Sequence, residues 1–174
     1  MAGVVLTGET IRRLIQGDRP LVRGYRDLER QVQPNGIDLT LESIWRTAGQ
    51  GQLGIEDGER LAAPRVAVVC GEQDFYELAA GAYVFRLNEV VDLPPDLMAL
   101  ARPRSSLLRS GVAVHNAVWD AGYTGRSEGL MVIYNPAGFR VRRHARILQL
   151  VFFRLEGRAA PYRGAYQGEH IERS

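Results

Sequence analysis

Alternation of apolar and polar residues with a period of two is the feature that most restricts how this chain can fold. It runs through residues 37–41, 83–87, 130–134 and 147–153. Successive side chains of a β-strand point to opposite faces of a sheet, so such segments are typical of half-buried strands. We therefore predict an all-β sandwich or barrel, because turn-forming residues separate these segments: Gly71, Gly81, Pro94, Pro95, Gly111, Gly122, Gly125, Pro136 and Gly138.

The N-terminal segment departs from this alternation. Thr7 is followed by apolar residues at helical spacing, which predicts a short helix that begins after an N-cap at Thr7 and ends at Gly17. A chain of 174 residues has the length of one domain. We predict a single domain over residues 1–174 whose last part, residues 162–174, is a flexible tail that frays or closes over a ligand. Residues 49–60 indicate no clear strand.

Composition excludes several classes of protein. Apolar residues make up 45% and charged residues 24%, as in globular proteins. The chain has neither an apolar run of about 18–20 residues nor a signal-peptide pattern, so we expect a cytoplasmic protein with no membrane partner. The basic residues are all arginine, but the net charge of +2 is too small to indicate nucleic-acid binding. The lone Cys70 excludes a disulfide framework, and the scattered histidines disfavour zinc.

Basic and hydroxyl side chains follow the apolar segment 97–100. Arg104, Ser105, Ser106 and Arg109 lie within six residues. Serines can begin a helical turn whose free backbone N–H groups face an anion, and guanidinium groups add charged donors. The segment could therefore hold phosphate, although it lacks the glycine spacing of a P-loop. A solvated basic turn is the alternative.

A second candidate segment, residues 114–125, is rich in polar and aromatic groups. His115, Asn116 and Trp119 precede Asp120 and Tyr123 in a stretch whose glycines permit a tight hairpin. Such a hairpin can present backbone groups to a base while an aromatic ring packs on a sugar. If burial holds its carboxylate in place, Asp120 can orient or deprotonate a water molecule. The alternatives are a turn-forming role for Asp120 and a core position for Trp119.

Two further polar residues interrupt apolar segments. Asp38 lies between Ile37 and Leu39, and Gln149 lies within the segment 147–153. A carboxylate at this place can bind Mg²⁺ through water, because Mg²⁺ retains several waters and prefers one or two carboxylates plus substrate phosphates. Exposure on the solvent face of a strand explains both residues without function.

Together these segments resemble the superfamily shared by dUTPases and dCTP deaminases, and most closely its archaeal-type dUTPase branch. The resemblance covers residues 34–168 in family order. The segments that carry it are Pro34-Asn-Gly-Ile-Asp38-Leu, Arg104-Ser-Ser-Leu-Leu-Arg109, Trp119-Asp-Ala-Gly-Tyr123-Thr-Gly125, Ala145-Arg-Ile-Leu-Gln149-Leu and Tyr162-Arg-Gly-Ala-Tyr166-Gln-Gly168.

The resemblance implies a homotrimer of distorted jelly-roll subunits that hydrolyses dUTP to dUMP and pyrophosphate at subunit interfaces. Asp120 would activate the water that attacks the α-phosphate, and Tyr123 would pack against the deoxyribose and exclude a 2′-hydroxyl. The hairpin with His115, Asn116 and Trp119 would read the base. The triphosphate would be held by Arg104, Ser105, Ser106, Arg109 and Gln149, with Mg²⁺ bound to Asp38 through water and the tail contributing Tyr162, Tyr166 and Gln167.

The deaminase branch carries a glutamate in the strand that corresponds to the segment ending at Asn135, shortly before that asparagine. This chain has Leu130 or Val132 there, depending on the alignment, and Glu128 would take that place only in a shifted strand. The tail has Ala165 where deaminases often carry a phosphate-contacting lysine, which could shift that contact to Arg163. A dCTP deaminase, with or without hydrolysis, and a non-catalytic nucleotide-binding trimer therefore stay open as alternatives.

Overall fold

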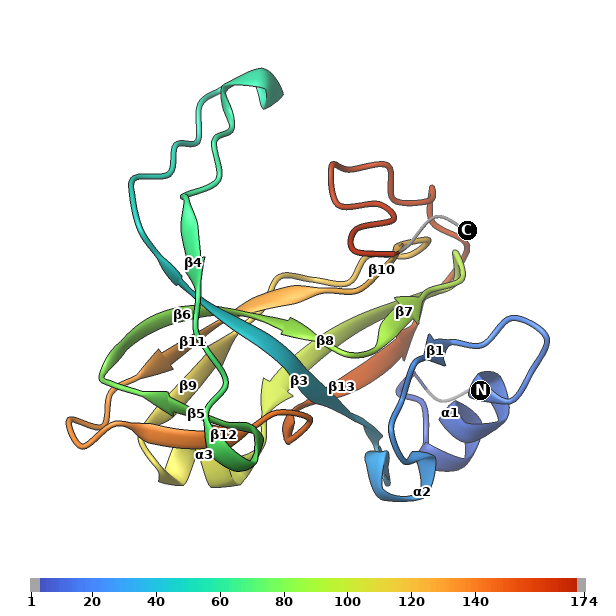
Figure 1. The fold of residues 1–174 in the computed structure, drawn as a ribbon. Coiled ribbons are helices and arrows are strands. Elements are labelled where there is room, and N and C mark those ends of the chain that lie inside the picture. Colours follow the sequence, from blue (N-terminus) through green and yellow to red (C-terminus); the bar gives the residue numbers. More distant parts are fainter. Residues whose placement is uncertain (1–3, 172–174) are drawn as a thin grey trace.

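The alternating segments are strands in the computed structural model, which describes residues 4–171 (Figure 1). The helices and 3₁₀ turns are α1 (Gly8–Ile15), α2 (Leu28–Gln31), η1 (Asp57–Glu59), η2 (Glu72–Asp74) and α3 (Ser105–Arg109). The strands are β1 (Val22–Arg23), β2 (Val32–Gln33), β3 (Gly36–Thr47), β4 (Arg65–Ala67), β5 (Phe75–Leu78), β6 (Gly81–Leu87), β7 (Val90–Asp92), β8 (Leu97–Pro103), β9 (Val112–His115), β10 (Thr124–Gly125), β11 (Glu128–Ile133), β12 (Phe139–Arg142) and β13 (Arg146–Arg154). The predicted mainly-β fold is confirmed.

The main sheet is an antiparallel barrel that is nearly closed. Its strands follow the order β8-β13-β3-β6-β11-β9, and β2 and β4 also pair with β3. The strands at the two ends of this order, β8 and β9, lie against each other. Two small sheets, β1-β7-β10 and β12-β5, flank the barrel.

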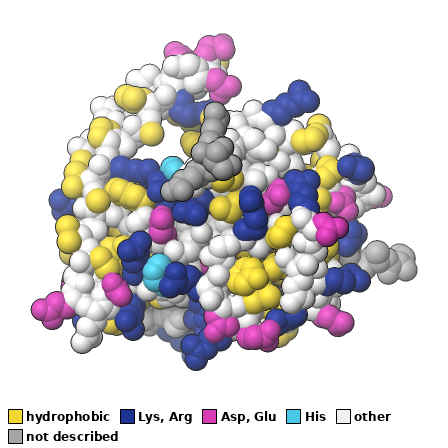
Figure 2. All heavy atoms as spheres, turned by 45° about the vertical axis from the view of Figure 1, so that its right-hand side comes forward, with side chains coloured by type: hydrophobic (Ala, Val, Ile, Leu, Met, Phe, Trp, Pro, Cys, Tyr) yellow, Lys and Arg dark blue, Asp and Glu magenta, His cyan; other side chains and the backbone are white. Residues whose placement is uncertain are grey.

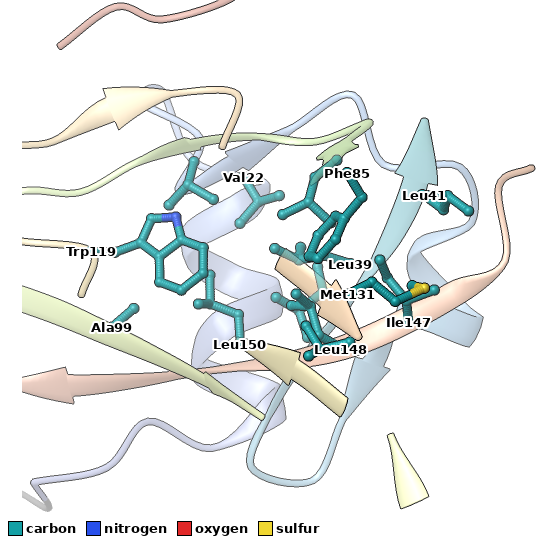
Figure 3. Close-up of a cluster of buried hydrophobic side chains, with 14 of the residues drawn as sticks. Val22, Leu39, Leu41, Phe85, Ala99, Trp119, Met131, Ile147, Leu148 and Leu150 are labelled. Carbon is teal, nitrogen blue, oxygen red and sulfur yellow. The ribbon is translucent and has the colours of Figure 1, made fainter. Parts of the chain in front are cut away.

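Apolar side chains from opposite walls fill the barrel (Figure 3). Phe85 of β6 and Phe152 of β13 are fully buried, as are Leu39 of β3 and Met131 of β11. The Trp119 indole lies at one end of the cluster near Ala99. Trp119 is thus a core residue, which was one of the two interpretations of its place in the sequence. Its position joins the core to the segment that follows β9.

Local sequence explains the N-terminal helix. The Thr7 side chain accepts a hydrogen bond from the Thr10 backbone N–H, and its own backbone is extended, as an N-cap requires. The helix ends at Ile15, close to the predicted Gly17, and buries Ile11 and Ile15. The short helix α2 was not predicted, because four residues are too few for a periodic pattern.

Residues 49–60, for which no strand was predicted, lie in an arm of residues 48–64 that extends away from the barrel (Figure 1). The arm links β3 to β4, and an isolated antiparallel bridge between Gln52 and Leu61 joins its outgoing and returning segments. Leu53 and Ile55 on the arm are exposed. Gly, Gln and acidic side chains cannot build a buried face here, which explains why the pattern indicated no strand.

Charged side chains are distributed rather than collected on the face shown in Figure 2. Arginines on this face are interspersed with acidic and apolar residues. Within residues 4–171, no helix has the length and hydrophobicity needed to cross a bilayer.

A buried carboxylate joins the barrel strands to the N-terminal segment. Glu89 is fully buried, and its oxygens accept hydrogen bonds from the Thr40 backbone N–H (2.9 Å), the Thr40 hydroxyl (2.6 Å) and Gln31 Nε2 (2.8 Å). These partners are neutral. Burial raises the pKa of Glu89, although the hydrogen bonds from Thr40 and Gln31 oppose that shift.

This raised pKa makes stability depend on pH. The folded state binds the Glu89 proton more tightly than the unfolded chain, whose glutamate pKa is about 4.3. Stability should therefore fall as pH rises from that value through the folded-state pKa, by about 1.4 kcal/mol for each unit of the shift. Glu89→Gln cannot titrate, so the difference in unfolding free energy, wild type minus variant, should shrink as pH rises. Urea unfolding between pH 4 and 8 measures this difference.

Glu156→Gln is the matched control, because Glu156 is exposed on the loop after β13. Its unfolding free energy should stay parallel to that of the wild type across the pH range. A difference between wild type and Glu89→Gln that is independent of pH would contradict the expectation.

Candidate active site

A sharp turn places the second candidate segment at the end of the barrel. Trp119 forms a bridge with Ala99 of β8, and the Tyr123 N–H donates to the Asp120 carbonyl (3.1 Å). Gly122 adopts a left-handed conformation (φ 79°) in this turn, where a side chain would be strained. The turn thereby presents Asp120 and Tyr123 on the same side.

A cavity of about 550 Å³ opens beside this turn. Apolar side chains form part of its wall, and acidic and aromatic groups form the rest. Asp120 is exposed at the cavity rather than buried, so the expected burial of this carboxylate is not found within one chain. The lining residues are Val84, Ala117, Val118, Trp119, Asp120, Tyr123, Ser127, Glu128, Gly129, Leu130, Tyr162, Tyr166 and Glu169.

A row of hydrogen bonds runs along one wall of the cavity. Trp119 Nε1 donates to Ser127 Oγ (2.7 Å), which lies 2.9 Å from Tyr123 Oη. Tyr123 Oη in turn donates to Glu169 Oε1 (2.7 Å). Burial raises the pKa of Tyr123 well above its usual value, so the phenol remains protonated and can act as a donor.

Glu128 lines the cavity but is held by cations. Its carboxylate contacts Arg65 (2.6 Å), Arg86 (3.0 Å) and His170 Nε2 (3.1 Å). Burial favours the neutral acid, yet the hydrogen bond and charge of Arg65, together with Arg86 and His170, outweigh burial and lower the pKa of Glu128. A carboxylate stabilised in this way is a weak proton carrier, which disfavours the role that a deaminase would require of it.

The tail lies over the cavity of its own chain. Gln167 bridges the turn, because its Oε1 accepts from the Thr124 N–H (3.0 Å) and its Nε2 donates to the Gly122 carbonyl (3.0 Å). The Tyr162 ring packs edge-on against Tyr123, with 5.8 Å between ring centres. Tyr162 and Tyr166 both line the cavity, and their predicted contact with substrate stays a prediction, while residues 172–174 of the predicted tail fall outside the described residues.

The predicted phosphate-binding residues form a separate group. α3 begins at Ser105, as expected, and carries Ser106 and Arg109 on exposed positions. α3 and the tail lie at opposite ends of the molecule in Figure 1. The cavity lining contains none of Arg104, Ser105, Ser106, Arg109 or Gln149. His115 and Asn116 precede the turn but likewise do not line the cavity.

Asp38 belongs to this second group and is almost completely buried, with 2% of its surface exposed. Its Oδ2 lies 3.1 Å from Arg104 Nε and 3.3 Å from Arg146 Nη1. Gln149 is paired with Asp38 in the register of β13 and β3. Burial raises the pKa of Asp38, and the two guanidinium groups oppose that rise. Solvent exposure on a strand face is therefore excluded for Asp38.

Several neighbours of the site were missed by sequence reasoning. Ser127 and Glu169 lie on no predicted motif, and Arg146 lies within one but was assigned no role. Each depends on long-range contact: Glu169 reaches Tyr123 across 46 residues, and Arg146 reaches Asp38 across 108. The one local signal was the closeness of Ser127 in sequence, four residues after Tyr123 in the short link between β10 and β11.

The chain belongs to the dCTP deaminase-like family, whose sequence profile matches residues 5–155, and this family places it among proteins of nucleotide metabolism. A solved 2′-deoxycytidine 5′-triphosphate deaminase from Agrobacterium tumefaciens is similar to it, with a TM-score of 0.66 and 28% identity. That match covers 87% of this chain and 48% of the longer deaminase chain.

Full-length relatives carry a more specific name. A probable deoxyuridine 5′-triphosphate nucleotidohydrolase of Archaeoglobus fulgidus is 49% identical over 97% of this chain and 98% of its own. A probable enzyme of the same name from Methanosarcina mazei is 41% identical over 95% and 98%. The deoxyuridine 5′-triphosphate nucleotidohydrolase of Methanocaldococcus jannaschii is 34% identical over 80% and 89%.

The position of the Tyr123 ring requires a glycine at 125. A Cβ added there would lie 2.3 Å from Tyr123 Oη and 3.1 Å from Glu169 Cγ. Gly125→Ala should therefore displace the ring and the tail, at a cost of about 1–3 kcal/mol typical of overpacking. We expect lower stability in urea unfolding and a large loss of nucleotide turnover.

Gly58→Ala in the arm is the matched control, since a Cβ there meets nothing within 4 Å. It should leave both measurements close to those of the wild type. Equal behaviour of the two alanine variants would contradict the assignment of Gly125.

Proposed function

We propose that this chain hydrolyses dUTP to dUMP and pyrophosphate. The observation that carries the proposal is the shared cavity of Asp120 and Tyr123, which combines a carboxylate with an aromatic wall in a space suited to a small molecule. The names of the full-length relatives support the same reaction.

Asp120 acts as the general base in this proposal. Its exposed carboxylate takes a proton from a water molecule, whose oxygen forms a bond to the α-phosphorus. The bond from that phosphorus to the bridging oxygen breaks, and pyrophosphate leaves with the bonding electrons. A positioned carboxylate contributes typically ~10²–10⁴-fold, and alignment and charge stabilisation supply the rest.

The base and sugar lie against the other walls of the cavity. Tyr123 packs on the deoxyribose, and the apolar Val118 and Leu130 lie near the base, which the backbone of residues 115–119 reads. Leu130 cannot move a proton, and Glu128 is engaged by Arg65 and Arg86. These groups favour hydrolysis over deamination of dCTP.

The triphosphate requires cations that the cavity of one chain does not supply. The charged residues that line the cavity are Asp120, Glu128 and Glu169, all acidic, and they repel a triphosphate. Arg104 caps α3 and Arg109 ends it, and α3 lies at the opposite end of the molecule from the tail in Figure 1. We therefore propose that the site is completed between copies, with α3 of one subunit facing the cavity of the next in a homotrimer, together with Gln149 and the serines of α3.

Asp38, with Arg104, Arg146 and Gln149 beside it, would hold Mg²⁺ that is bound to the incoming nucleotide. Both arginine contacts are made by Oδ2, which leaves Oδ1 to accept a hydrogen bond from a metal-bound water. Arg104 and Arg146 already outweigh the single negative charge of Asp38, so the free protein attracts a cation poorly at this point. Mg²⁺ supplies neutralisation of the phosphate charge when bound, and Arg104 and Gln149 hold the oxygens in place.

Product analysis with separate nucleotides tests the reaction. With Mg²⁺ present, the wild type should convert dUTP to dUMP and pyrophosphate and leave dCTP and UTP nearly unchanged. Asp120→Asn should reduce turnover by roughly 10²–10⁴-fold, because the amide cannot accept the proton, while dUTP binding measured by calorimetry persists.

Asp18→Asn is the control for this variant, because Asp18 is exposed in the turn after α1. Ammonia released from dCTP would contradict the proposal and indicate that Glu128 acts on the base as in a deaminase. Binding without turnover of any nucleotide would favour the non-catalytic alternative, and unchanged turnover in Asp120→Asn would overturn the role of that carboxylate.

Complementation tests the shared site. Arg109→Ala and Asp120→Asn carry their defects on opposite sides of the proposed interface, so each alone should be nearly inactive. In a mixed trimer of the two variants, which a double tag selects, about one interface in three should join two intact halves. Turnover of co-expressed, doubly tagged protein should recover accordingly.

Analytical ultracentrifugation shows whether the mixed oligomers form. Mixed oligomers without activity beyond that of the separate variants would place the whole site within one chain.

A further inference from the structure

Tyr123 is held more firmly than packing against a sugar requires. Its hydroxyl donates its single proton to Glu169 Oε1, so the proton between Tyr123 and Ser127 must come from Ser127. Ser127 Oγ in turn accepts from the Trp119 indole N–H. The donors therefore run in one direction, from Trp119 through Ser127 and Tyr123 to Glu169.

Each end of this row lies in a different part of the fold. Trp119 is 4% exposed and anchored in the barrel core, and Ser127 is 6% exposed. Glu169 comes from the tail and is fixed by its backbone, because the Arg126 N–H donates to the Glu169 carbonyl (3.0 Å). The far end of the Tyr123 ring is thus pinned between the rigid barrel and a segment that lies over the cavity.

We propose that Ser127 and Glu169 are positioning residues that fix the Tyr123 ring and thereby set the preference for a deoxyribose over a ribose. This inference rests on the proposed function, in which Tyr123 faces the sugar. It adds that the preference is complete only when the tail is closed, because Glu169 reaches Tyr123 only from the tail.

The physical reason is steric. A ring excludes a 2′-hydroxyl only if it cannot rotate away, and the hydrogen bonds at Oη oppose that rotation. A hydrogen bond of this kind contributes about 0.5–1.5 kcal/mol, and more when a charged acceptor takes part. Loss of the Glu169 contact leaves the Tyr123 hydroxyl with Ser127 as its one hydrogen-bond partner, so the ring can yield to the larger sugar.

The proposal is tested by the ratio of kcat/KM for dUTP to that for UTP. Glu169→Ala and Ser127→Ala should each lower this ratio roughly tenfold, mainly by improving UTP turnover. Glu169→Gln should restore most of the ratio, because its amide oxygen still accepts from Tyr123. Rescue by the conservative variant separates positioning from a general effect on folding.

Gln167→Ala is the matched variant within the tail. Gln167 fixes the tail to Thr124 and Gly122 without contacting Tyr123. Its loss should raise KM for both nucleotides by similar factors and lower their ratio by less than Glu169→Ala does, because Glu169 stays joined to the barrel through the Arg126 N–H. A ratio that stays at the wild-type value in both Glu169→Ala and Ser127→Ala would overturn the proposal, as would an equal fall in Gln167→Ala.

A measurement without substrate distinguishes this proposal from the proposed function. The indole N–H resonance of Trp119, assigned with a Trp45→Phe variant, should shift in Ser127→Ala and, by a smaller amount through Tyr123, in Glu169→Ala. An unmoved resonance in both variants would overturn the row of hydrogen bonds. If the wild type fails to hydrolyse dUTP while the resonance shifts, the proposed function fails and the link between tail and barrel stands.

Discussion

The pairing of β3 on both of its edges is the constraint on which the rest of the structure depends. This strand pairs with β13 and β2 near its start and with β6 and β4 toward its end. Asp38, near its beginning, forms ion pairs with Arg104 and Arg146, beside the predicted phosphate-binding residues. Near its end, the Trp45 ring lies between Arg65 and Arg86, the same cations that hold Glu128 beside the cavity. One strand thus supports both halves of the proposed site.

Buried polar groups keep these two halves in register with the core. Glu89 binds the Thr40 backbone, and Gln31 joins Glu89 to the Asp38 carbonyl (2.8 Å). A slip of one residue in β3 would leave the Glu89 carboxylate without its donors and turn Leu39 and Leu41 away from the core. Both losses are costly, so the position of Asp38 is set by fold stability as well as by any role in binding.

Sequence reasoning reached the strands because alternation and turn residues are local signals. The segments at 37–41, 83–87 and 147–153 all lie within observed strands, and Thr7 caps α1. The site was reached in part: the turn with Asp120 and Tyr123 follows from its glycines. The Asp38 ion pairs and the contact of Glu169 with Tyr123 depend on residues far apart in the chain, and no periodicity records them.

The contacts of the tail also bear on the rate of turnover. Its backbone is joined to the barrel by bonds such as those from Gly168 N–H to the Thr124 carbonyl and from Tyr162 N–H to the Ala121 carbonyl, in a largely exposed segment. Water competes for such bonds, so the segment belongs to the part of the molecule that opens at low free-energy cost. Tyr162, Tyr166 and Glu169 of the tail line the cavity, so in the proposed reaction the tail lies beside the bound nucleotide. Motions of this kind occur in microseconds to milliseconds, and where product release requires them they limit turnover whatever the rate of the proton transfer proposed for Asp120.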